Sequence, residues 1–167
     1  FDPYVTQEQA SAINVELVDL DTLLAEADYI VILCKLTDET HHLINTERLA
    51  KMKEGAFLIN VARGPIVDEV ALFTALRSGR IRGAGLDVFE QEPPDPSNPL
   101  FTLDNVIVAP HALGWTDETA WGIGSGVVDA ILAVREGNVP KTLVNTEVVE
   151  SPRFQEKLAA LKSRWGA

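Results

Sequence analysis

The amino-acid sequence predicts an α/β protein with a doubly wound parallel sheet. Two observations support this fold class: short apolar runs recur along the chain, and segments with helix signals separate them. Most of the runs lack a strict alternation of apolar and polar residues, which is typical of parallel strands covered on both faces. Strands that alternate with helices connect in right-handed units, so we expect one parallel sheet with helices packed on it.

Five segments are predicted to form strands, and each is a short apolar run. In chain order they are Ile13 to Val18, Tyr29 to Leu33, Ala56 to Val61, Ala84 to Val88, and Val106 to Ala109. Residues 90–105 contain four prolines, so a long loop is predicted between the last two strands.

Helices are predicted between the strands and after the last one. Asp19 and Thr116 are potential caps before two of these segments, and Asn45 begins another. Gly79 and Gly137 follow segments that end there, as is usual at helix C-termini. The predicted helices cover residues 21–27, 45–51, 68–78, 116–136 and 151–165.

The last two predicted helices carry patterns that indicate packing. Gly122, Gly124 and Gly126 weaken helicity, and we expect them to allow the close approach of another helix. In the final helix, four apolar side chains at helical spacing predict one packed face. They are Phe154, Leu158, Leu161 and Trp165.

The composition is that of an ordinary globular protein and argues against several kinds of partner. The 167 residues include 14 basic and 25 acidic side chains, and the net charge of −11 would repel nucleic acid and anionic membrane surfaces. The single cysteine, Cys34, excludes an internal disulfide and fits a reducing compartment, so a cytoplasmic location is expected. No apolar run approaches the ~20 residues needed to span a bilayer.

Polar side chains follow the predicted strands, at the edge where ligands gather in open α/β sheets. Arg63 follows the third run, His111 follows the last one, and Glu92 lies in the proline-rich loop before it. An arginine, a glutamate and a histidine near neighbouring strand ends form a candidate site. Three further polar residues lie at or near predicted strand ends, namely Cys34, Lys35 and Asp87, and Asp2 follows what looks like the tail of another strand.

Each member of this candidate site also has an ordinary structural explanation. Arg63 could pair with an acid at the start of the next helix, Asp68 or Glu69. Glu92 could be a solvated loop acid, and His111 could be satisfied by backbone groups. The residues taken singly therefore leave both explanations open.

The remaining candidates favour structural roles. Cys34 at a strand end is more often a small buried residue than a nucleophile. His41 and His42 lie in the polar stretch TDETHH and are expected at the surface. No metal site is predicted.

Two long segments carry a more specific pattern. They read NVARGPIVDEVALFTALRSGRIRGAGLDVFEQEPP, residues 60–94, and NVIVAPHALGWT, residues 105–116. Together they resemble the signature region of the D-isomer-specific 2-hydroxyacid dehydrogenases, and the similarity extends from FDPY to VNTEVV. The resemblance implies a Rossmann-type nucleotide domain joined to a flavodoxin-like substrate domain. It places residues 1–140 in the second half of the NAD-binding domain and residues 141–167 in a tail that crosses to the substrate domain.

The resemblance also implies catalytic roles for three residues. Arg63 would bind the substrate carboxylate and polarise the C2 carbonyl, because its planar fork can share donors between both groups. His111 would be the general acid and base. Glu92 would pair with His111, and a neighbouring carboxylate favours the charged imidazolium.

The same resemblance implies a cofactor site for NAD. Asp2 would bind the adenosine ribose hydroxyls, and a carboxylate there would repel the 2′-phosphate of NADP. Asp87 would hold the nicotinamide carboxamide, and Gly114 would pass near the nicotinamide ribose. The other positions that line the nicotinamide side are Cys34, Val61, Ala62, Arg63 and His111.

The sequence departs from the family pattern in three ways. The chain holds no G-x-G-x-x-G phosphate loop, and it begins Phe1-Asp2-Pro3-Tyr4 without a methionine, so we expect a segment of a longer protein. Residues 33–36 read LCKL, which leaves the role of Lys35 open. The stretch HALG is followed by Trp115, whose role is also open.

Two functions from different classes fit these residues. The first is an NAD-dependent oxidoreductase that interconverts 2-hydroxy and 2-oxo acids, similar to glyoxylate/hydroxypyruvate reductases or phosphoglycerate dehydrogenases. The second is an NAD-responsive scaffold like the C-terminal-binding-protein corepressors, which share the Arg, Glu and His. The enzyme is favoured because the chain has no basic or disordered tail. A homodimer is expected, with the glycine-rich helix as a candidate contact.

Overall fold

A computed structural model describes residues 1–165. The chain divides into two compact units, Phe1–Leu113 and Gly114–Ala167. Each unit is described by itself below, and the candidate site lies in the first.

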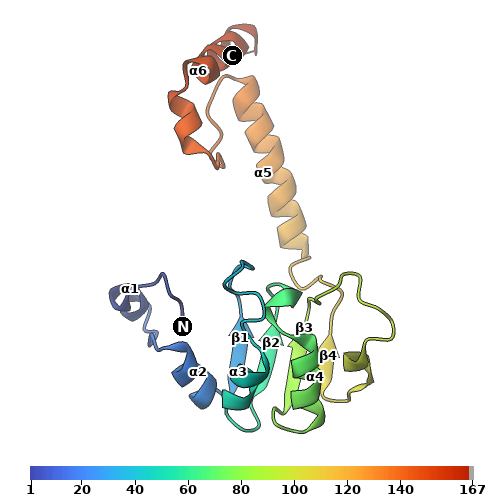
Figure 1. Ribbon diagram of the computed structural model, residues 1–167. Helices are drawn as coiled ribbons and strands as arrows, with labels where there is room; N and C mark the ends of the chain where they lie inside the picture. Colours follow the sequence, from blue (N-terminus) through green and yellow to red (C-terminus); the bar gives the residue numbers. More distant parts are fainter. Residues whose placement is uncertain (166–167) are drawn as a thin grey trace. The chain divides into compact units, whose positions relative to one another are not determined.

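The first unit contains one sheet of four parallel strands, as predicted (Figure 1). The strands lie in the order of the sequence, and each pairs only with its neighbours along the chain. They are β1 (Tyr29–Ile32), β2 (Phe57–Asn60), β3 (Gly83–Leu86) and β4 (Val106–Val108). Their register brings Ile32, Asn60, Leu86 and Val108 side by side, so all four strands end at the same edge.

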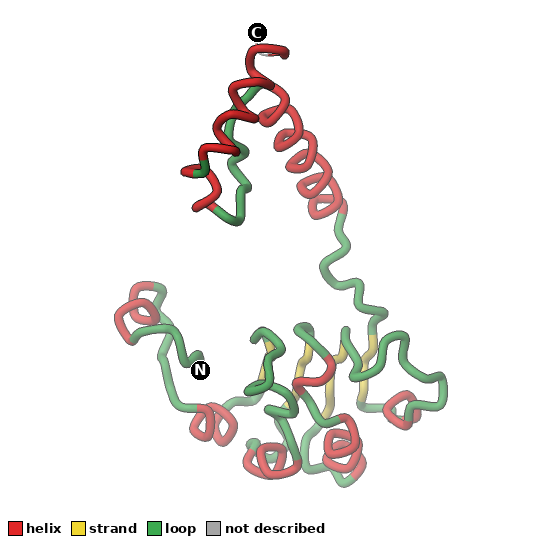
Figure 2. Tube along the Cα trace, turned by 45° about the horizontal axis from the view of Figure 1, so that its top comes forward, coloured by secondary structure: helices red, strands yellow, loops and turns green. Residues whose placement is uncertain are grey.

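The helices that pack on this sheet lie on one face of it. Figure 2 shows them on a single side of the strands. Right-handed crossovers between strands that pair in sequence order place every connecting helix on the same face. The elements are α1 (Gln7–Ala12), α2 (Leu20–Glu26), α3 (Thr46–Lys51) and α4 (Glu69–Arg77), with the 3-10 turns η1 (Gly64–Ile66) and η2 (Pro99–Thr102).

The opposite face of the sheet is open within the described part of the chain. Tyr29 is 67% exposed and Ile107 79% exposed, whereas Ile30 and Ile32 on the helix side are buried. The Tyr29 and Phe57 rings stack on the open face, with their centroids 5.2 Å apart. The expectation that the strands are covered on both faces is therefore wrong for this stretch of chain, because the connections between its strands supply helices to one face only.

The core lies between the sheet and α2, α3 and α4. Its fully buried side chains include Leu24, Leu49, Leu58 and Leu72, and burying each contributes about 1.5–3 kcal/mol. Among residues 1–165, the buried polar side chains are Asn60, 1% exposed, and Asp87, 4% exposed. Both lie at the carboxyl edge of the sheet.

Helix caps account for most of the helix boundaries. Asp19, Asn45 and Asp68 each accept a hydrogen bond from a backbone N–H in the first turn of α2, α3 and α4. Gly79 follows α4 with a φ of +73°, as expected for a residue after a helix. These predicted boundaries agree with the structure within one or two residues.

Two elements of the first unit differ from the prediction. Residues 13–18 form no strand; this segment connects α1 and α2, and Ile13 is 71% exposed. An apolar run becomes a strand only when another strand pairs with it, and none does so here. The structure adds α1, which a reciprocal capping box between Thr6 and Gln9 begins.

The second unit is helical. It contains α5 (Asp117–Arg135), η3 (Thr146–Glu150) and α6 (Pro152–Trp165), and α5 packs against α6. Leu158 is buried and Phe154 and Leu161 are half-buried, which confirms these three positions of the predicted packed face, whereas Trp165 is exposed. Gly137, with φ +76°, ends the α5 region, and a Cβ there would meet Lys162 Cβ at 2.4 Å.

The glycines inside α5 do not have the predicted packing role within residues 1–165. A Cβ added at Gly122, Gly124 or Gly126 would meet no atom within 4 Å. Their expected use in close helix approach is therefore wrong for the described part of the chain.

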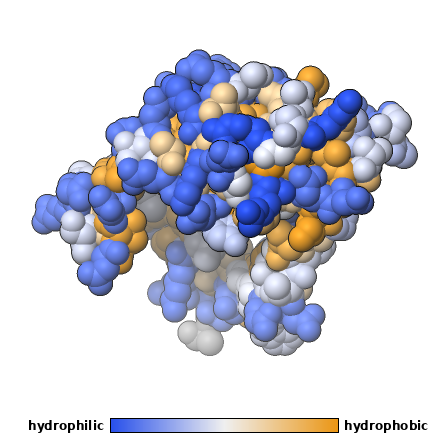
Figure 3. All heavy atoms as spheres, turned by 90° about the horizontal axis from the view of Figure 1, so that it is seen from below, coloured by the Kyte–Doolittle hydropathy of each residue, from blue (hydrophilic) through white to orange (hydrophobic). Residues whose placement is uncertain are grey.

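The surface is largely polar on the side that Figure 3 shows, with scattered apolar patches. This agrees with the strongly acidic composition. Among the described residues, no helix is both long and apolar enough to span a membrane.

Candidate functional site

The candidate site lies along the edge where the four parallel strands end. Because those ends are in register, the segments that follow them are neighbours in space. The segment after β1 carries Cys34 and Lys35, the segment after β2 carries Arg63, Asp87 directly follows β3, and His111 follows β4. The structure thus brings together four strand-end segments, as the sequence predicts.

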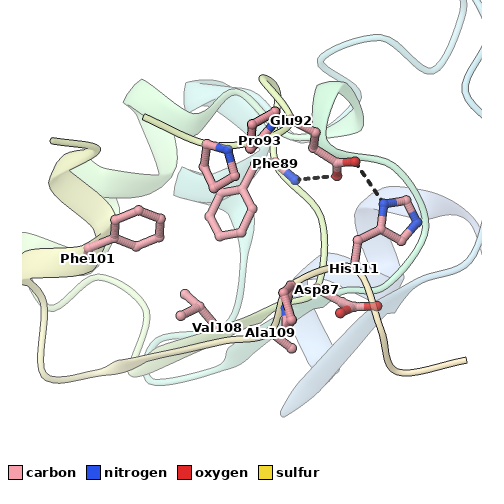
Figure 4. A pocket seen from close by; sticks show the side chains of 10 residues that line it. Asp87, Phe89, Glu92, Pro93, Phe101, Val108, Ala109 and His111 are labelled. Carbon is pink, nitrogen blue, oxygen red and sulfur yellow. Dashed lines mark hydrogen bonds and ion pairs between the residues drawn. The ribbon is translucent and has the colours of Figure 1, made fainter. Parts of the chain in front are cut away.

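The centre of the site is a pair between Glu92 and His111 (Figure 4). Nδ1 of His111 lies 2.8 Å from Oε2 of Glu92, and the other carboxylate oxygen accepts the N–H of Phe89 at 3.1 Å. Both side chains remain partly exposed, at 46% for His111 and 38% for Glu92. The carboxylate therefore fixes one ring nitrogen and leaves Nε2 without a hydrogen-bond partner among residues 1–165.

Charge at this site keeps Glu92 ionised. Burial raises the pKa of Glu92, but the hydrogen bond to His111 and the Phe89 N–H lower it. The positive charges of His111 and Arg63 lower it further, and the net result is a pKa below the ordinary value of 4.5. Glu92 is thus an acceptor for His111 across the neutral pH range.

Asp87 holds the segment that carries His111. Its two carboxylate oxygens accept the N–H groups of Ala112 at 2.9 Å and Leu113 at 3.2 Å. His111 has a φ of +56°, in the left-handed region that few residues other than glycine adopt. The buried carboxylate thus stabilises an unusual turn at the histidine.

Arg63 has no acidic partner within residues 1–165. Asp68, one of the two acids considered for it, caps α4 instead. Glu69, the other, accepts the N–H of Glu90 and a hydrogen bond from Asn98. The guanidinium donates only to the adjacent carbonyl of Ala62, at 2.6 Å, so most of its donors are free for a ligand.

The loop after β2 packs tightly against the loop that carries Glu92. A Cβ at Gly64 would lie 1.9 Å from the backbone of Phe89, so only glycine fits there. Gly64 directly follows Arg63, and Phe89 donates its N–H to Glu92. This contact links the positions of the arginine and the glutamate.

Asn60 is a site residue that the sequence analysis did not identify. It is the last residue of β2, and its side chain contacts the loop that holds Arg63. The signal was present in the sequence: Asn60 is two residues after the buried Leu58, so both face the same side of the strand. A polar residue in that position must find hydrogen bonds.

Two hollows flank the site. The first, of about 360 Å³, is lined by Asp87, Glu92 and His111 together with apolar side chains such as Phe89 and Phe101. Figure 4 shows the two phenylalanines on the side of this hollow away from His111. They lie edge to face, with their ring centroids 5.5 Å apart.

The second hollow, of about 470 Å³, lies where β1 and β2 end. It is lined by Leu33, Cys34, Lys35, Leu36, Val61, Ala62 and Arg63. Cys34 is exposed rather than buried as expected, because it lies past the end of β1 in the segment that lines this hollow. Partial burial of the thiol and the nearby charge of Asp2 raise its pKa, so the thiol stays neutral. A mostly apolar wall that also carries Lys35 and the Arg63 guanidinium fits a flat, partly polar ring such as nicotinamide.

Other predicted positions are less closely tied to the centre. Asp2 lies in no strand, and it accepts the N–H of Tyr4 at 2.8 Å. Lys35 lines the second hollow, and its carbonyl accepts the Thr40 hydroxyl at 2.7 Å. Gly114 and Trp115 belong to the second unit, so their relation to the site stays a prediction.

His42 is less exposed than predicted. Its Nε2 lies 3.4 Å from the carboxylate of Glu90, and its side chain is 36% exposed. His41 is an exposed surface residue, as expected. Within residues 1–165, no cluster of three His, Cys, Asp or Glu side chains could hold a metal ion.

This arrangement can carry out proton transfer beside a bound anion. The Glu92–His111 pair supplies a histidine whose free nitrogen can give or take a proton. Arg63 supplies a permanent positive charge at the end of β2, on the same edge of the sheet, and most of its donors are free within residues 1–165. Together they match a carboxylate-bearing substrate that undergoes proton transfer at a nearby oxygen.

Comparison with known proteins agrees with this geometry. The model of one protein family, described as "D-isomer specific 2-hydroxyacid dehydrogenase, NAD binding domain", matches residues 1–112. The glyoxylate/hydroxypyruvate reductase B of Serratia proteamaculans is 48% identical over 144 residues, which is 86% of this chain and 44% of that protein. The chain thus spans less than half the length of this curated relative.

Solved structures show the same fold. A D-isomer specific 2-hydroxyacid dehydrogenase from Lactobacillus delbrueckii ssp. bulgaricus, in an NAD-complexed form, superposes with a TM-score of 0.79. It is 30% identical, and the match covers 86% of this chain and 47% of that one. A protein from Thermus thermophilus matches with a TM-score of 0.74 and 44% identity, over 78% of this chain and 42% of that one.

Proposed function

Because the chain belongs to the D-isomer specific 2-hydroxyacid dehydrogenase family, we propose that the protein containing it interconverts a 2-hydroxy acid and a 2-oxo acid with NAD as the cofactor. The observation that carries the proposal is the 2.8 Å pair of Glu92 and His111 beside an arginine that no acid neutralises within residues 1–165. Proton transfer and anion binding are the two tasks that this reaction sets for a protein.

His111 is the proposed proton donor in the reducing direction. Glu92 holds Nδ1 and orients the ring, and in the charged imidazolium Nε2 carries a proton that it can give to the substrate oxygen. In the oxidising direction the same nitrogen takes the proton back. The ionised Glu92 stabilises the charged ring in both directions.

Arg63 is the proposed anchor for the substrate. A guanidinium presents parallel donors that match a carboxylate, and a further donor can reach the adjacent carbonyl oxygen. This interaction stabilises the bound acid, and it becomes stronger as negative charge develops on that oxygen. Arg63 thus serves both binding and catalysis.

NAD is the proposed cofactor, and it supplies the hydride chemistry when bound. The hollow lined by Cys34, Val61 and Ala62 fits the nicotinamide, with Arg63 at its end. Asp2 is the proposed partner of the adenosine ribose, and its carboxylate would repel an NADP phosphate. Gly114 is proposed to pass near the nicotinamide ribose.

Asp87 is proposed to hold the carboxamide in addition to its role beside His111. Each carboxylate oxygen accepts one backbone N–H, and a carboxylate can accept about four hydrogen bonds in all. Two acceptor positions are thus free for the cofactor amide.

The substrate class follows from the relatives. Proteins named glyoxylate/hydroxypyruvate reductase B, from Serratia proteamaculans and other bacteria, are 46–48% identical to this chain. We therefore propose small 2-oxo acids such as glyoxylate and hydroxypyruvate as substrates.

The proposal extends to the organisation of the whole protein. Residues 1–140 form the second half of the NAD-binding domain, and residues 141–167 cross to a substrate domain. The protein is a cytoplasmic homodimer. In support, α5 presents a row of exposed apolar side chains within the described unit, namely Ile123, Val127 and Ile131.

A turnover assay on the full-length protein tests the proposal. With NADH and a panel of 2-oxo acids, glyoxylate or hydroxypyruvate should be reduced at rates of about 1–1,000 s⁻¹. Tight binding of NADH without oxidation by any 2-oxo acid would contradict the enzyme and favour the corepressor-like scaffold.

A further inference from the structure

The further inference concerns Asn60, the most completely buried polar side chain of the candidate site. Asn60 is 1% exposed and is the last residue of β2, three residues before Arg63. Its amide nitrogen donates to the carbonyl of Arg63 at 3.0 Å, and its amide oxygen accepts the N–H of Ala62 at 3.1 Å. The one side chain thus contacts the backbone of the arginine and of the residue before it.

These two bonds fix the orientation of the amide. The Ala62 N–H can only donate, and the Arg63 carbonyl can only accept, so nitrogen and oxygen cannot exchange places. The Asn60 side chain is buried, and both bonds are partly buried. An unsatisfied amide in such a place is costly, so the loop has a strong reason to keep this shape.

Within the described residues, Arg63 is positioned through its backbone rather than through its side chain. Arg63 is at the surface, and within residues 1–165 its guanidinium donates a hydrogen bond only to the Ala62 carbonyl. The main chain of Asn60 is itself fixed, because its carbonyl accepts the N–H of Asp87 at 3.0 Å. A rigid connection therefore runs from β3 through Asn60 to the start of the Arg63 side chain.

We infer that Asn60 is a positioning residue that holds the backbone conformation of Arg63. The guanidinium can then bind the carboxylate of a 2-oxo acid without a free-energy cost for ordering the loop. The inference rests on the proposed role of Arg63 as the substrate anchor. It assigns to Asn60 an effect on substrate binding although Asn60 itself does not reach the substrate.

The first test uses Asn60→Ala in the full-length protein. The KM for glyoxylate or hydroxypyruvate should rise about five- to tenfold, with a smaller fall in kcat and little change in the KM for NADH. The matched control is Leu58→Val, which perturbs the same face of β2 without touching the loop. A Leu58→Val protein with an equal loss of Tm and an equal rise in KM would overturn the positioning role.

The second test uses Asn60→Asp and varies the pH. An ionised carboxylate can only accept, so it loses the bond to the Arg63 carbonyl, whereas a protonated carboxyl can donate again. Burial raises the pKa of such a carboxyl, so the ratio of variant to wild-type KM should fall as the pH is lowered from 8 to about 5.5. A ratio that stays constant while circular dichroism shows a folded protein would contradict the inference.

The third test needs no turnover. Hydrogen exchange should show a protected Ala62 amide in the wild-type protein, and Asn60→Ala should speed its exchange at least about tenfold. The Ala112 amide, which Asp87 holds, is the internal control and should not change. Rapid exchange of Ala62 in the wild type would overturn the inference even if the protein reduces 2-oxo acids. Failure to reduce any 2-oxo acid would instead contradict the proposed function.

Discussion

At the scale of single residues, the site separates the binding of charge from the transfer of protons. Arg63 lies in the loop after β2 with most of its donors free among the described residues, whereas His111 lies after β4 and is held through Nδ1 by Glu92. Because the two tasks fall on different strands, their kinetic signatures should also be separable.

Arg63→Ala should raise KM for the 2-oxo acid and lower kcat. The guanidinium contacts the substrate in the ground state and stabilises the charge that develops later, so kcat/KM should fall by about 10- to 100-fold for each lost charged hydrogen bond. Steady-state kinetics of the full-length protein would measure this. An unchanged KM would remove Arg63 from the substrate site.

His111→Asn should act mainly on kcat. Removing a general acid typically costs about 100- to 10,000-fold in rate, while the Arg63 anchor still holds the substrate. The measurement is kcat and KM of variant and wild type under the same conditions. A large rise in KM with unchanged kcat would assign the histidine to binding rather than to proton transfer.

Glu92→Gln should make the free energy of unfolding depend less on pH in the acid range. The folded-state pKa of Glu92 lies below its ordinary 4.5, so the stabilisation is fully present above pH 4.5 and is lost as the pH falls through the lowered value. Urea unfolding of both proteins between about pH 3 and 7 should give curves that converge at low pH. Parallel curves over that range would exclude a stabilising role for the ionised carboxylate.

The sequence predicted the charged residues of the site better than the residues that hold them. Arg63, Glu92 and His111 follow apolar runs, and parallel strand ends gather at one edge, so their proximity could be inferred. The roles of Asn60 and of the Asp87 oxygens depend on the conformations of two loops. Tertiary contacts determine these conformations, and a local sequence pattern does not reveal such contacts.

At the scale of secondary-structure elements, two loops are fitted together. Gly64 in the loop after β2 lies against the backbone of Phe89 in the loop after β3. The contact leaves no room for a side chain at position 64. The position of the segment that carries Arg63 therefore depends on the position of the segment that carries Glu92.

Gly64→Ala should therefore disturb both segments at once. The new Cβ would lie 1.9 Å from Phe89 backbone atoms, which forces a shift that costs about 1–3 kcal/mol in unfolding free energy. The control is Gly85→Ala in β3, where the nearest atom would be an ordinary 3.8 Å away. Thermal unfolding of the two variants compares them, and an equal Tm would contradict this account of the loops.

The boundaries of helices and strands could be predicted where the sequence has helix-capping residues or buried apolar runs. The four strands of the sheet and the helices after Asp19, Asn45 and Asp68 appear where expected. Residues 13–18 read as a strand because local apolarity does not reveal whether a partner strand exists. The composition of the strands also did not reveal whether helices cover both faces of the sheet, because this depends on the strand order.

At the scale of the whole molecule, the chain carries the acid–base and anchoring side chains but contains no G-x-G-x-x-G motif. Pyrophosphate binding in this fold uses a glycine-rich turn and a helix N-terminus. The 167-residue chain by itself should therefore bind NADH weakly and reduce no 2-oxo acid. A fluorescence titration with NADH tests this, and micromolar affinity of the isolated chain would contradict it.

The order of the strands has a further consequence for how the first unit forms. A ribosome delivers β1 first, then β2, β3 and β4, and every hydrogen-bonded neighbour in the sheet is also the next strand to be synthesised. Among these four strands, each new one can pair with the one already in place without waiting for a more distant segment. The sheet can therefore grow from one side in the direction of translation.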